Sequence, residues 1–336
     1  MQFIDKIEKI DREQWDSFVT KHPDGNIFQT PVMYDIYNNS KNYEPRLSAI
    51  IEGGELVAVM LAVIQKDYTG QLGKLTARSV VFGGPLLKTD DKDILDELLK
   101  GYFATISREV IYTQVRNFNL QNNLQKSIFK NNEFEYENHL NIILDLKKGV
   151  NELWKGVKKN RKDGINKGRK QGFVFKVTEK LANVDRFYEL FKELYTNIRL
   201  PFPDVSFFQA INNYLGPNLK WFILEYNGKQ VIILCSFIYN KVLYFFSVGI
   251  WQNKDFLQLR PVDYFYWEVI KWSAENGIEK IDWMGAGRPE EDYGVRKFKI
   301  QYGGDLIELG RYQKIHKPMI FYLGKSGLKI WQKLKI

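Results

Sequence analysis

The feature that most constrains this chain is an order of strand and helix signals that occurs twice, about 170 residues apart. In each half, three runs of strand-forming residues are followed by a helix and one further strand. A Gly53-Gly54 turn joins the first two strands of one half, and Asn227-Gly228 joins those of the other. This repetition predicts two copies of one α+β unit. The expected strands are 46–52, 56–63, 75–82 and 111–118 in the first half, and 221–226, 230–239, 242–248 and 278–283 in the second. The expected helices are 31–40 and 92–109 in the first half, and 183–195, 206–214 and 261–277 in the second.

Length and composition agree with two folded units. A chain of 336 residues with 44% hydrophobic residues can bury two cores of ordinary size. It contains no run of 18 apolar residues, and residues 1–20 are too charged for a signal peptide, so we expect a cytoplasmic protein. With one cysteine, Cys235, and three histidines, the sequence shows no disulfide and no metal-ligand spacing. We therefore expect no metal and no cofactor.

The net charge of +9 is concentrated in two segments. Residues 155–176 hold nine basic residues and one acid, so we expect a partly helical, phosphate-binding segment. Gly164 and Gly168 are expected to loosen the packing of this helix. The phosphate could belong to a nucleic-acid backbone or to a nucleotide- or lipid-linked substrate. The candidate binding residues of the segment are Lys158, Arg161, Lys162 and Arg169.

The second basic segment is the C-terminal tail, where seven basic residues and no acid follow residue 310. Within it, apolar residues and lysines of 319–336 form an amphipathic pattern that includes Trp331. This pattern fits a helix that packs on the first unit, and it also fits a peripheral contact with an anionic membrane.

The loop before the helix at Pro261 reads GIWQNKDFLQLRP. The repeated order of strands and helix resembles that of the N-acyltransferase fold. In coenzyme A-dependent enzymes of this fold, the corresponding loop binds a pyrophosphate with a glycine-rich turn, whose bare backbone allows a close approach. Gly249 is the only glycine of this loop. The sequence therefore argues against a coenzyme A donor, although Arg260 remains a candidate phosphate ligand.

A short segment near the end of the second half concentrates the candidate catalytic groups. Tyr293-Gly294 and Gly303-Gly304 bracket an element that carries Arg296 and Lys299. A cation at the C-terminal end of a sheet suits a carbonyl that becomes an oxyanion, or a phosphate. Asp282, on the last expected strand, could orient an amine, and Tyr293 completes this set.

Three segments, WKGVKKNRKDGINKGRKQG, YFYWEVIKWSAENGIEKIDWMGAG and DYGVRKFKIQYGGDLIELG, resemble in this order the Fem family of peptidoglycan bridge-forming aminoacyltransferases. The resemblance covers most of residues 20–325. It implies two tandem GNAT-like N-acyltransferase domains and transfer of an amino acid from aminoacyl-tRNA to a cell-wall precursor. It also implies that the tail returns to the first domain.

The resemblance carries over to particular residues. Phe298 and Lys299 match a Phe-Lys pair in which the lysine is assigned to the reaction intermediate. In the first half, Gln29 and Tyr34 match a segment that lines the precursor site. Arg116 stands where family members often carry a dipeptide ending in proline.

The sequence thus predicts an acyltransferase that forms an amide on a peptidoglycan or other envelope precursor. We expect a first domain over 1–148, a second over 149–310 and a tail over 311–336. Two alternatives stay open: an N-acyltransferase that uses acyl-coenzyme A or an acyl carrier on an amino sugar or lipid precursor, and a non-catalytic protein that binds nucleic acid or a membrane surface.

Overall fold

The structure is a computed structural model that describes residues 1–68, 70–198 and 202–324. It contains two compact units. Unit 1 consists of residues 1–138 and the described residues from 309 on, and unit 2 consists of residues 139–308. The chain therefore leaves unit 1, builds unit 2 and returns. The first boundary follows residue 138, whereas the sequence placed it after residue 148. The described residues after 308 belong to unit 1.

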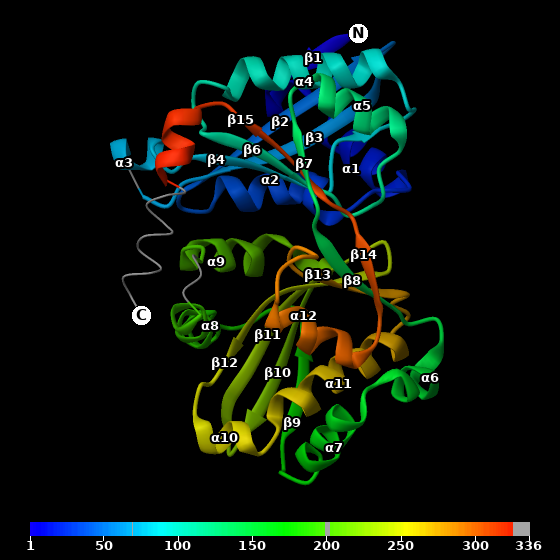
Figure 1. Cartoon of the computed structure of the whole chain (residues 1–336), viewed down its shortest axis with the longest axis vertical. Coiled ribbons are helices and arrows are strands. Elements are labelled where there is room, and N and C mark those ends of the chain that lie inside the picture. Colours follow the sequence, from blue (N-terminus) through cyan, green and yellow to red (C-terminus); the bar gives the residue numbers. More distant parts are fainter. Residues whose placement is uncertain (69, 199–201, 325–336) are drawn as a thin grey trace. The chain divides into compact units, whose positions relative to one another are not determined.

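Unit 1 is a mixed sheet covered by helices (Figure 1). Its strands are β1 Gln2–Ile4, β2 Tyr43–Glu52, β3 Glu55–Gln65, β4 Arg78–Phe82, β5 Leu86–Leu87, β6 Tyr112–Arg116, β7 Glu135–Glu137 and β15 Arg311–Ile315. Its helices are α1 Arg12–Lys21, α2 Pro31–Asn38, α3 Gly70–Lys74, α4 Lys92–Ile106 and α5 Asn123–Asn131. The strand order is β1-β2-β3-β4-β6-β15-β7, and β5 pairs with β3.

Unit 2 has the same plan. Its strands are β8 Leu140–Asp145, β9 Val174–Thr178, β10 Leu219–Tyr226, β11 Lys229–Tyr239, β12 Val242–Ile250, β13 Lys280–Gly285 and β14 Asp305–Glu308. Its helices are α6 Gly149–Gly156, α7 Lys159–Gly168, α8 Asp185–Asn197, α9 Val205–Tyr214, α10 Lys254–Gln258, α11 Pro261–Glu275 and α12 Gly294–Lys299. The strand order is β14-β8-β13-β12-β11-β10-β9.

Local turn chemistry explains the two hairpins of unit 2. Asn227 and Gly228, between β10 and β11, both have positive φ, as do Asn240 and Lys241, between β11 and β12. Two consecutive residues of positive φ form the tight turn whose twist matches that of antiparallel strands. The predicted three-stranded meander is therefore present and slightly longer than expected.

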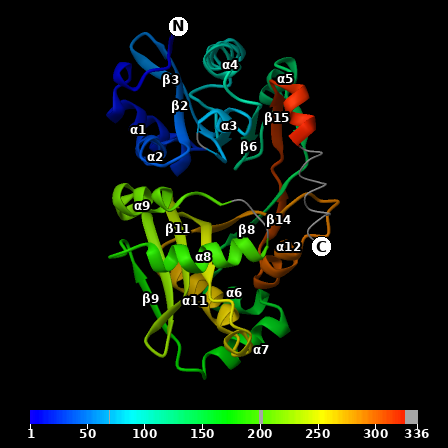
Figure 2. The same ribbon diagram turned by 90° about the vertical axis from the view of Figure 1, so that its left-hand side faces the viewer.

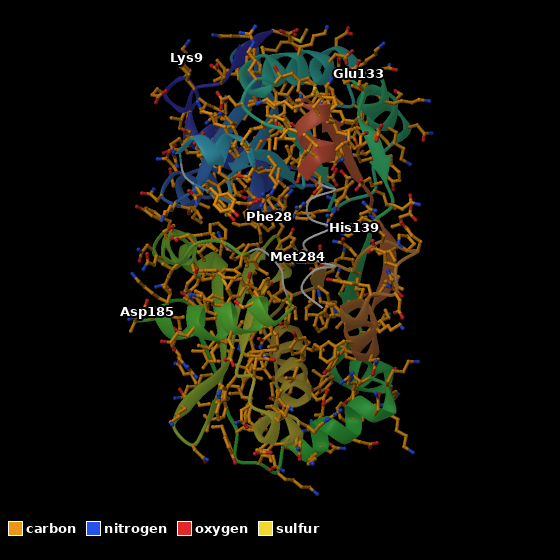
Figure 3. All side chains as sticks on the ribbon, turned by 60° about the vertical axis from the view of Figure 1, so that its left-hand side comes forward. Lys9, Phe28, Glu133, His139, Asp185 and Met284 are labelled. Atoms are coloured by element: carbon orange, nitrogen blue, oxygen red, sulfur yellow. The ribbon has the colours of Figure 1, made fainter. Side chains whose placement is uncertain are left out.

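Each face of the unit 2 sheet packs on a different set of helices (Figure 2). On β11, Ile232 and Leu234 belong to the core that includes α11. On the neighbouring strand β10, Trp221 packs edge-on against Phe187 of α8, at 4.9 Å between ring centroids. Since side chains alternate along a strand, one sheet can bury both faces. Asp185, labelled in Figure 3, marks the start of α8.

The structure corrects several expected bounds. The strand expected over 75–82 begins at Arg78. The basic segment is partly helical, as expected, and its last residues belong to β9. Strands β8, β14 and β15 were not predicted at all. Residues 318–324 are helical, and Phe321 packs edge-on against Tyr112 of β6, at 5.5 Å. The rest of the expected amphipathic tail, 325–336, lies outside the described residues.

Candidate active site

The candidate site of unit 2 lies where two parallel strands separate. β12 and β13 pair only over Val242–Tyr244 and Lys280–Asp282, although β12 continues to Ile250. In unit 1, the corresponding strands β4 and β6 pair along 78–82 and 112–116 without such a break. Among the described residues, the backbone of β12 beyond Tyr244 therefore has no partner strand on the β13 side. We call this separation of the two strands the opening.

A bulge in β13 lies at the opening. Asp282 pairs with Ile143 of β8 and Gly285 pairs with Asn141, so two residues of β13 face one of β8. Met284, labelled in Figure 3, has a φ of 61° and donates its N–H to Asp282 Oδ1 at 2.7 Å. Bulges redirect backbone groups beside many active sites.

Lys299 brings a cation to this bulge. It is the last residue of α12, it is partly buried, and its Nζ donates to the carbonyl oxygen of Trp283 at 2.5 Å. Burial lowers the pKa of Lys299 to about 8, while the charge of Asp282 favours the protonated form. At neutral pH the ammonium is therefore mostly protonated and able to donate to an oxyanion.

Asp282 is the acidic group beside Lys299. Its side chain is 2% exposed, and burial raises its pKa to about 6, although the Met284 N–H, the charge of Lys299 and the side chain of Asn141 all lower it. Asn141 donates to both carboxylate oxygens, at 3.3 and 3.4 Å. Between pH 6 and 8 the two groups carry opposite charges beside the opening.

Aromatic rings surround this pair. Phe298, next to Lys299, contacts Tyr266 and Tyr302, each at 5.3 Å between ring centroids. Trp283 stacks on Tyr266 at 5.6 Å between ring centroids, and both rings belong to the hydrophobic core that includes α11. Phe298 therefore has a packing role, and Lys299 is the polar group that this aromatic layer supports.

Three tyrosines of unit 2 affect one another's pKa electrostatically. Burial, followed by the nearby Tyr293, raises the pKa of Tyr195 on α8 to about 12. Burial, followed by Tyr195, raises the pKa of Tyr266 on α11. Tyr293 was predicted as a site residue, whereas Tyr195 and Tyr266 were not.

The predicted phosphate ligands divide into two groups. Lys158, Lys162 and Arg169 lie at the surface of unit 2 on or beside α7. The ammonium of Lys162 and the guanidinium of Arg169 lie 5.7 and 5.2 Å from the ring centroid of Trp154. This face presents cations and an aromatic ring, which is suitable for a phosphate-bearing ligand.

The other three cations are bound within the protein. Arg161 and Arg260 both pair with Asp263, at 2.8 and 2.7 Å. Arg296 donates to backbone carbonyls of the loop after β13, including those of Ala286 and Arg288 at 3.2 and 2.6 Å. The structure therefore gives these three side chains a role in fixing loops and helices.

Gly164 and Gly168 also act differently from the expectation. A Cβ at Gly164 would lie 2.3 Å from Asp263 Oδ2, and one at Gly168 would lie 2.6 Å from the Cβ of Tyr264. The expectation that these glycines loosen the packing is wrong, because they permit the close approach of α7 to α11.

The residues predicted in unit 1 form no comparable constellation. Gln29 is fully buried, and its side-chain amide bonds to the backbone of Leu61 and Phe82. Tyr34 is partly buried and packs edge-on against Trp15, at 6.4 Å. Gln29 thus holds strands together. Tyr34 keeps part of its side chain exposed.

Arg116 is the unit 1 residue best suited to bind an anion. Its Nε donates to Gln114 at 2.9 Å, its guanidinium lies 5.0 Å from the ring centroid of Phe82, and burial lowers its pKa. No carboxylate in the part of the chain described here pairs with it. The described residues also contain no group of three or more His, Cys, Asp or Glu able to hold a metal ion, and no helix long and apolar enough to cross a membrane.

Residues that the sequence did not indicate complete the site. Asp263, Tyr302 and Asn141 contact predicted residues from elsewhere in the chain. Asp263 follows the helix-starting Pro261, and an acid in a first turn is too common a helix feature to identify a partner for Arg161, 102 residues away.

Comparison with known proteins defines the class of the fold. Residues 155–294, wholly within unit 2, match the family model of the acetyltransferase (GNAT) domain. A tandem GNAT protein from the clavulanic acid biosynthesis pathway has a TM-score of 0.58 and 8% identity, over 94% of this chain and 98% of that chain. The expected fold class, an α+β chain of two GNAT-like units, is confirmed.

Within this class, the fold is similar to that of FemX. The crystal structure of FemX has a TM-score of 0.72 and 14% identity, over 96% of this chain and 99% of that chain. The L-PGS of Bacillus licheniformis has a TM-score of 0.57 and 14% identity, over 91% and 92% of the two chains. No curated protein sequence matches this chain. The resemblance to the Fem type is thus confirmed at the level of the fold.

Proposed function

We propose that this protein is an acyltransferase that forms an amide on a cell-envelope precursor, with an aminoacyl ester as donor. The observation that carries the proposal is the ammonium of Lys299 beside the bulge of β13, at the opening between β12 and β13. The GNAT match of unit 2 supports acyl transfer. The similarity to FemX and to the C-terminal domain of a protein described as a putative lysylphosphatidylglycerol synthetase from Agrobacterium fabrum, at a TM-score of 0.56, supports an envelope substrate.

The chemistry follows from the groups at the opening. The neutral amine of the acceptor attacks the ester carbonyl carbon, and a tetrahedral intermediate with a negative oxygen forms. Lys299 donates to this oxygen. The carbon–oxygen bond of the donor then breaks, and the leaving oxygen takes up the proton that the amine loses. One preorganised donor of this kind contributes about 3–4 kcal/mol to the transition state.

The identity of the donor rests on the loop between β12 and α11. In this protein the loop forms α10, and Arg260 follows it with a φ of 65° directly before Pro261. A helix in place of a glycine-rich turn offers few bare N–H groups to a pyrophosphate. This supports an aminoacyl-tRNA donor. The GNAT match supports acyl-coenzyme A as the second candidate, and isothermal titration with coenzyme A separates the two.

We propose that the acceptor carries phosphate groups. The proposal rests on the cations that are not paired with carboxylates in the described part of the chain. Arg116 in unit 1 and the Lys158, Lys162 and Arg169 face of unit 2 suit the phosphates of a nucleotide- or lipid-linked precursor or of tRNA. Lys158→Ala and Arg169→Ala variants would separate these roles, because the loss of a phosphate contact weakens the salt dependence of binding to the affected ligand.

The decisive test is the product. The masses of envelope precursors, measured by mass spectrometry, are compared between cells that carry the wild-type gene, a Lys299→Ala variant or no gene. We expect one added acyl or aminoacyl mass that requires the gene, and roughly a 100- to 1000-fold lower rate of its formation by Lys299→Ala in vitro.

Lys297→Ala is the matched control, because Lys297 lies on the same helix and its side chain is 64% exposed in a pair with Asp292. It should keep wild-type activity. Full activity of a folded Lys299→Ala protein would refute the role of Lys299, and the absence of any gene-dependent mass would refute the transferase.

A further inference from the structure

Asp263, in the first turn of α11, is a buried carboxylate at the centre of a charged cluster in unit 2. Its side chain is 4% exposed, and its carboxylate accepts from Arg161 Nη1 at 2.8 Å and from the Tyr302 hydroxyl at 2.8 Å. Arg260 Nε lies 2.7 Å from the other oxygen. One carboxylate thus joins α7, α11 and the short 3-10 helix that directly follows Lys299, Ile300–Tyr302.

Arg161 extends this cluster to both sides of Lys299. Its Nε donates to Gln301 Oε1 at 2.9 Å, and its guanidinium lies over the ring of Phe298, at 4.5 Å from the centroid. The backbone N–H of Lys158 donates to the Gln301 carbonyl at 2.9 Å. The residue before Lys299 and the two residues that follow Ile300 are therefore held by α7 and Asp263.

The segment that carries Lys299 depends on such anchors. α12 has six residues, too few to be stable without tertiary contacts. At its start, Arg296 holds the carbonyls of the loop after β13. At its end, Arg161 and Tyr302 are tied to Asp263. Lys299 lies between the two anchors, and its own ammonium donates to the Trp283 carbonyl.

We propose that Asp263 is a positioning residue for Lys299: by binding Arg161, Arg260 and the Tyr302 hydroxyl, it fixes the end of α12 on α11 and so sets the place of the ammonium beside the bulge of β13. The inference rests on the proposed function for its catalytic consequence. Its structural part, the placement of Lys299, can be measured without any acyl donor.

Two substitutions release the anchor by different amounts. Asp263→Asn keeps the size of the side chain but leaves two neighbouring guanidinium groups without a counter-charge. Tyr302→Phe removes a single hydroxyl and keeps the ring that packs on Phe298. Displacement of a reacting group by about 1 Å can lower a rate by roughly 100-fold, so we expect kcat to fall about 10- to 100-fold in Asp263→Asn and less in Tyr302→Phe.

The test combines kinetics with labelling of lysines by acetic anhydride across a pH series, followed by peptide mass spectrometry. In the wild type, the labelling of Lys299 should follow a pKa of about 8. The pKa should be higher by about one unit in Asp263→Asn and by less in Tyr302→Phe, because an ammonium that leaves its buried place regains hydration. Labelling of Lys229, which is exposed at the start of β11, should not change. KM should stay within about threefold, since the donor and acceptor surfaces are intact.

Asp255→Asn is the control, because Asp255 is also an acid in a first helical turn but is exposed. It should match the wild type in both measurements. Folded Asp263→Asn and Tyr302→Phe proteins with wild-type labelling of Lys299 would overturn the proposal. If instead the labelling changes but no preparation forms a product, the positioning role stands and the proposed function fails.

Discussion

Asp282 and Lys299 are a buried pair of opposite charges whose pKa values are both displaced towards neutrality. Asp282 binds more protons in the folded than in the unfolded state between pH 3.8 and 6, so its contribution to stability falls as the pH rises through that range. Lys299 binds fewer protons in the folded state between pH 8 and 10.5, so its contribution rises with pH there. Near neutral pH both groups therefore destabilise the fold at the site where they are needed.

Asp282→Asn should accordingly stabilise the protein and lower its activity at alkaline pH. At pH 7.5 we expect the free energy of unfolding, from urea titration, to increase by about 1–3 kcal/mol, since a buried charge is removed while the acceptor for the Met284 N–H is kept. Without Asp282, the pKa of Lys299 falls further, so the decline of activity at alkaline pH should begin at a lower pH. A less stable variant would show that attraction to Lys299 outweighs the cost of burying Asp282.

At the scale of elements, α7 is attached to α11 through residues that the sequence presents as a basic surface. Gly164 and Gly168 bring the two helices close, and Arg161 turns inward to Asp263. The periodicity of charge along α7 correctly indicated a helix. It did not indicate which cation is buried, because the partner acid is distant in sequence.

Replacement of Gly164 by Ala should test this contact. A new Cβ would overlap Asp263 and Arg260, so we expect a loss of about 1–3 kcal/mol in the free energy of unfolding. Gly156→Ala is the matched control, because Gly156 ends the helix before α7 and a Cβ added there would meet no heavy atom of the described residues within 4 Å. It should be neutral or slightly stabilising. Equal stability of the two variants would contradict the close approach.

The difference between local sequence signals and contacts distant in sequence explains which parts of the fold could be predicted. The hairpins at Gly53-Gly54 and Asn227-Gly228 and the helix at Pro261 follow from local turn and cap chemistry, and the sequence located them. Strands β8, β14 and β15 are short and pair with partners distant in sequence, such as Leu140 with Glu308, so local patterns did not identify them. Lys299 and Asp282, named from the sequence, lie close together in the structure. The internal contacts of Arg161 and Arg296 depend on residues distant in sequence or in a loop.

At the scale of the whole chain, unit 1 is formed by residues that precede unit 2 in the sequence and residues that follow it. β15 lies between β6 and β7, and His316, just beyond β15, bonds through its ring to Thr113 at 2.9 Å. Tyr312 of β15 is 4% exposed and stacks on Phe129 at 4.6 Å. The C-terminal strand is therefore part of the core of unit 1.

Tyr312→Ala should destabilise unit 1 selectively. We expect a loss of about 3 kcal/mol or more from the cavity that it leaves, and faster hydrogen exchange in β6 and α5. Exchange in β10–β12 of unit 2 should be unchanged. Tyr322→Ala, at a position that is 58% exposed, serves as the control. Equal acceleration in both units would contradict their independence.

The return of the chain has a consequence for biosynthesis. Unit 2 begins and ends on neighbouring strands, since β8 and β14 pair, and all of its residues leave the ribosome before β15 does. Unit 2 can therefore fold during translation while the sheet of unit 1 still lacks β15, between β6 and β7. Until residue 315 emerges, β6 and β7 lack the strand that pairs with both, and such unpaired edges can pair with other chains.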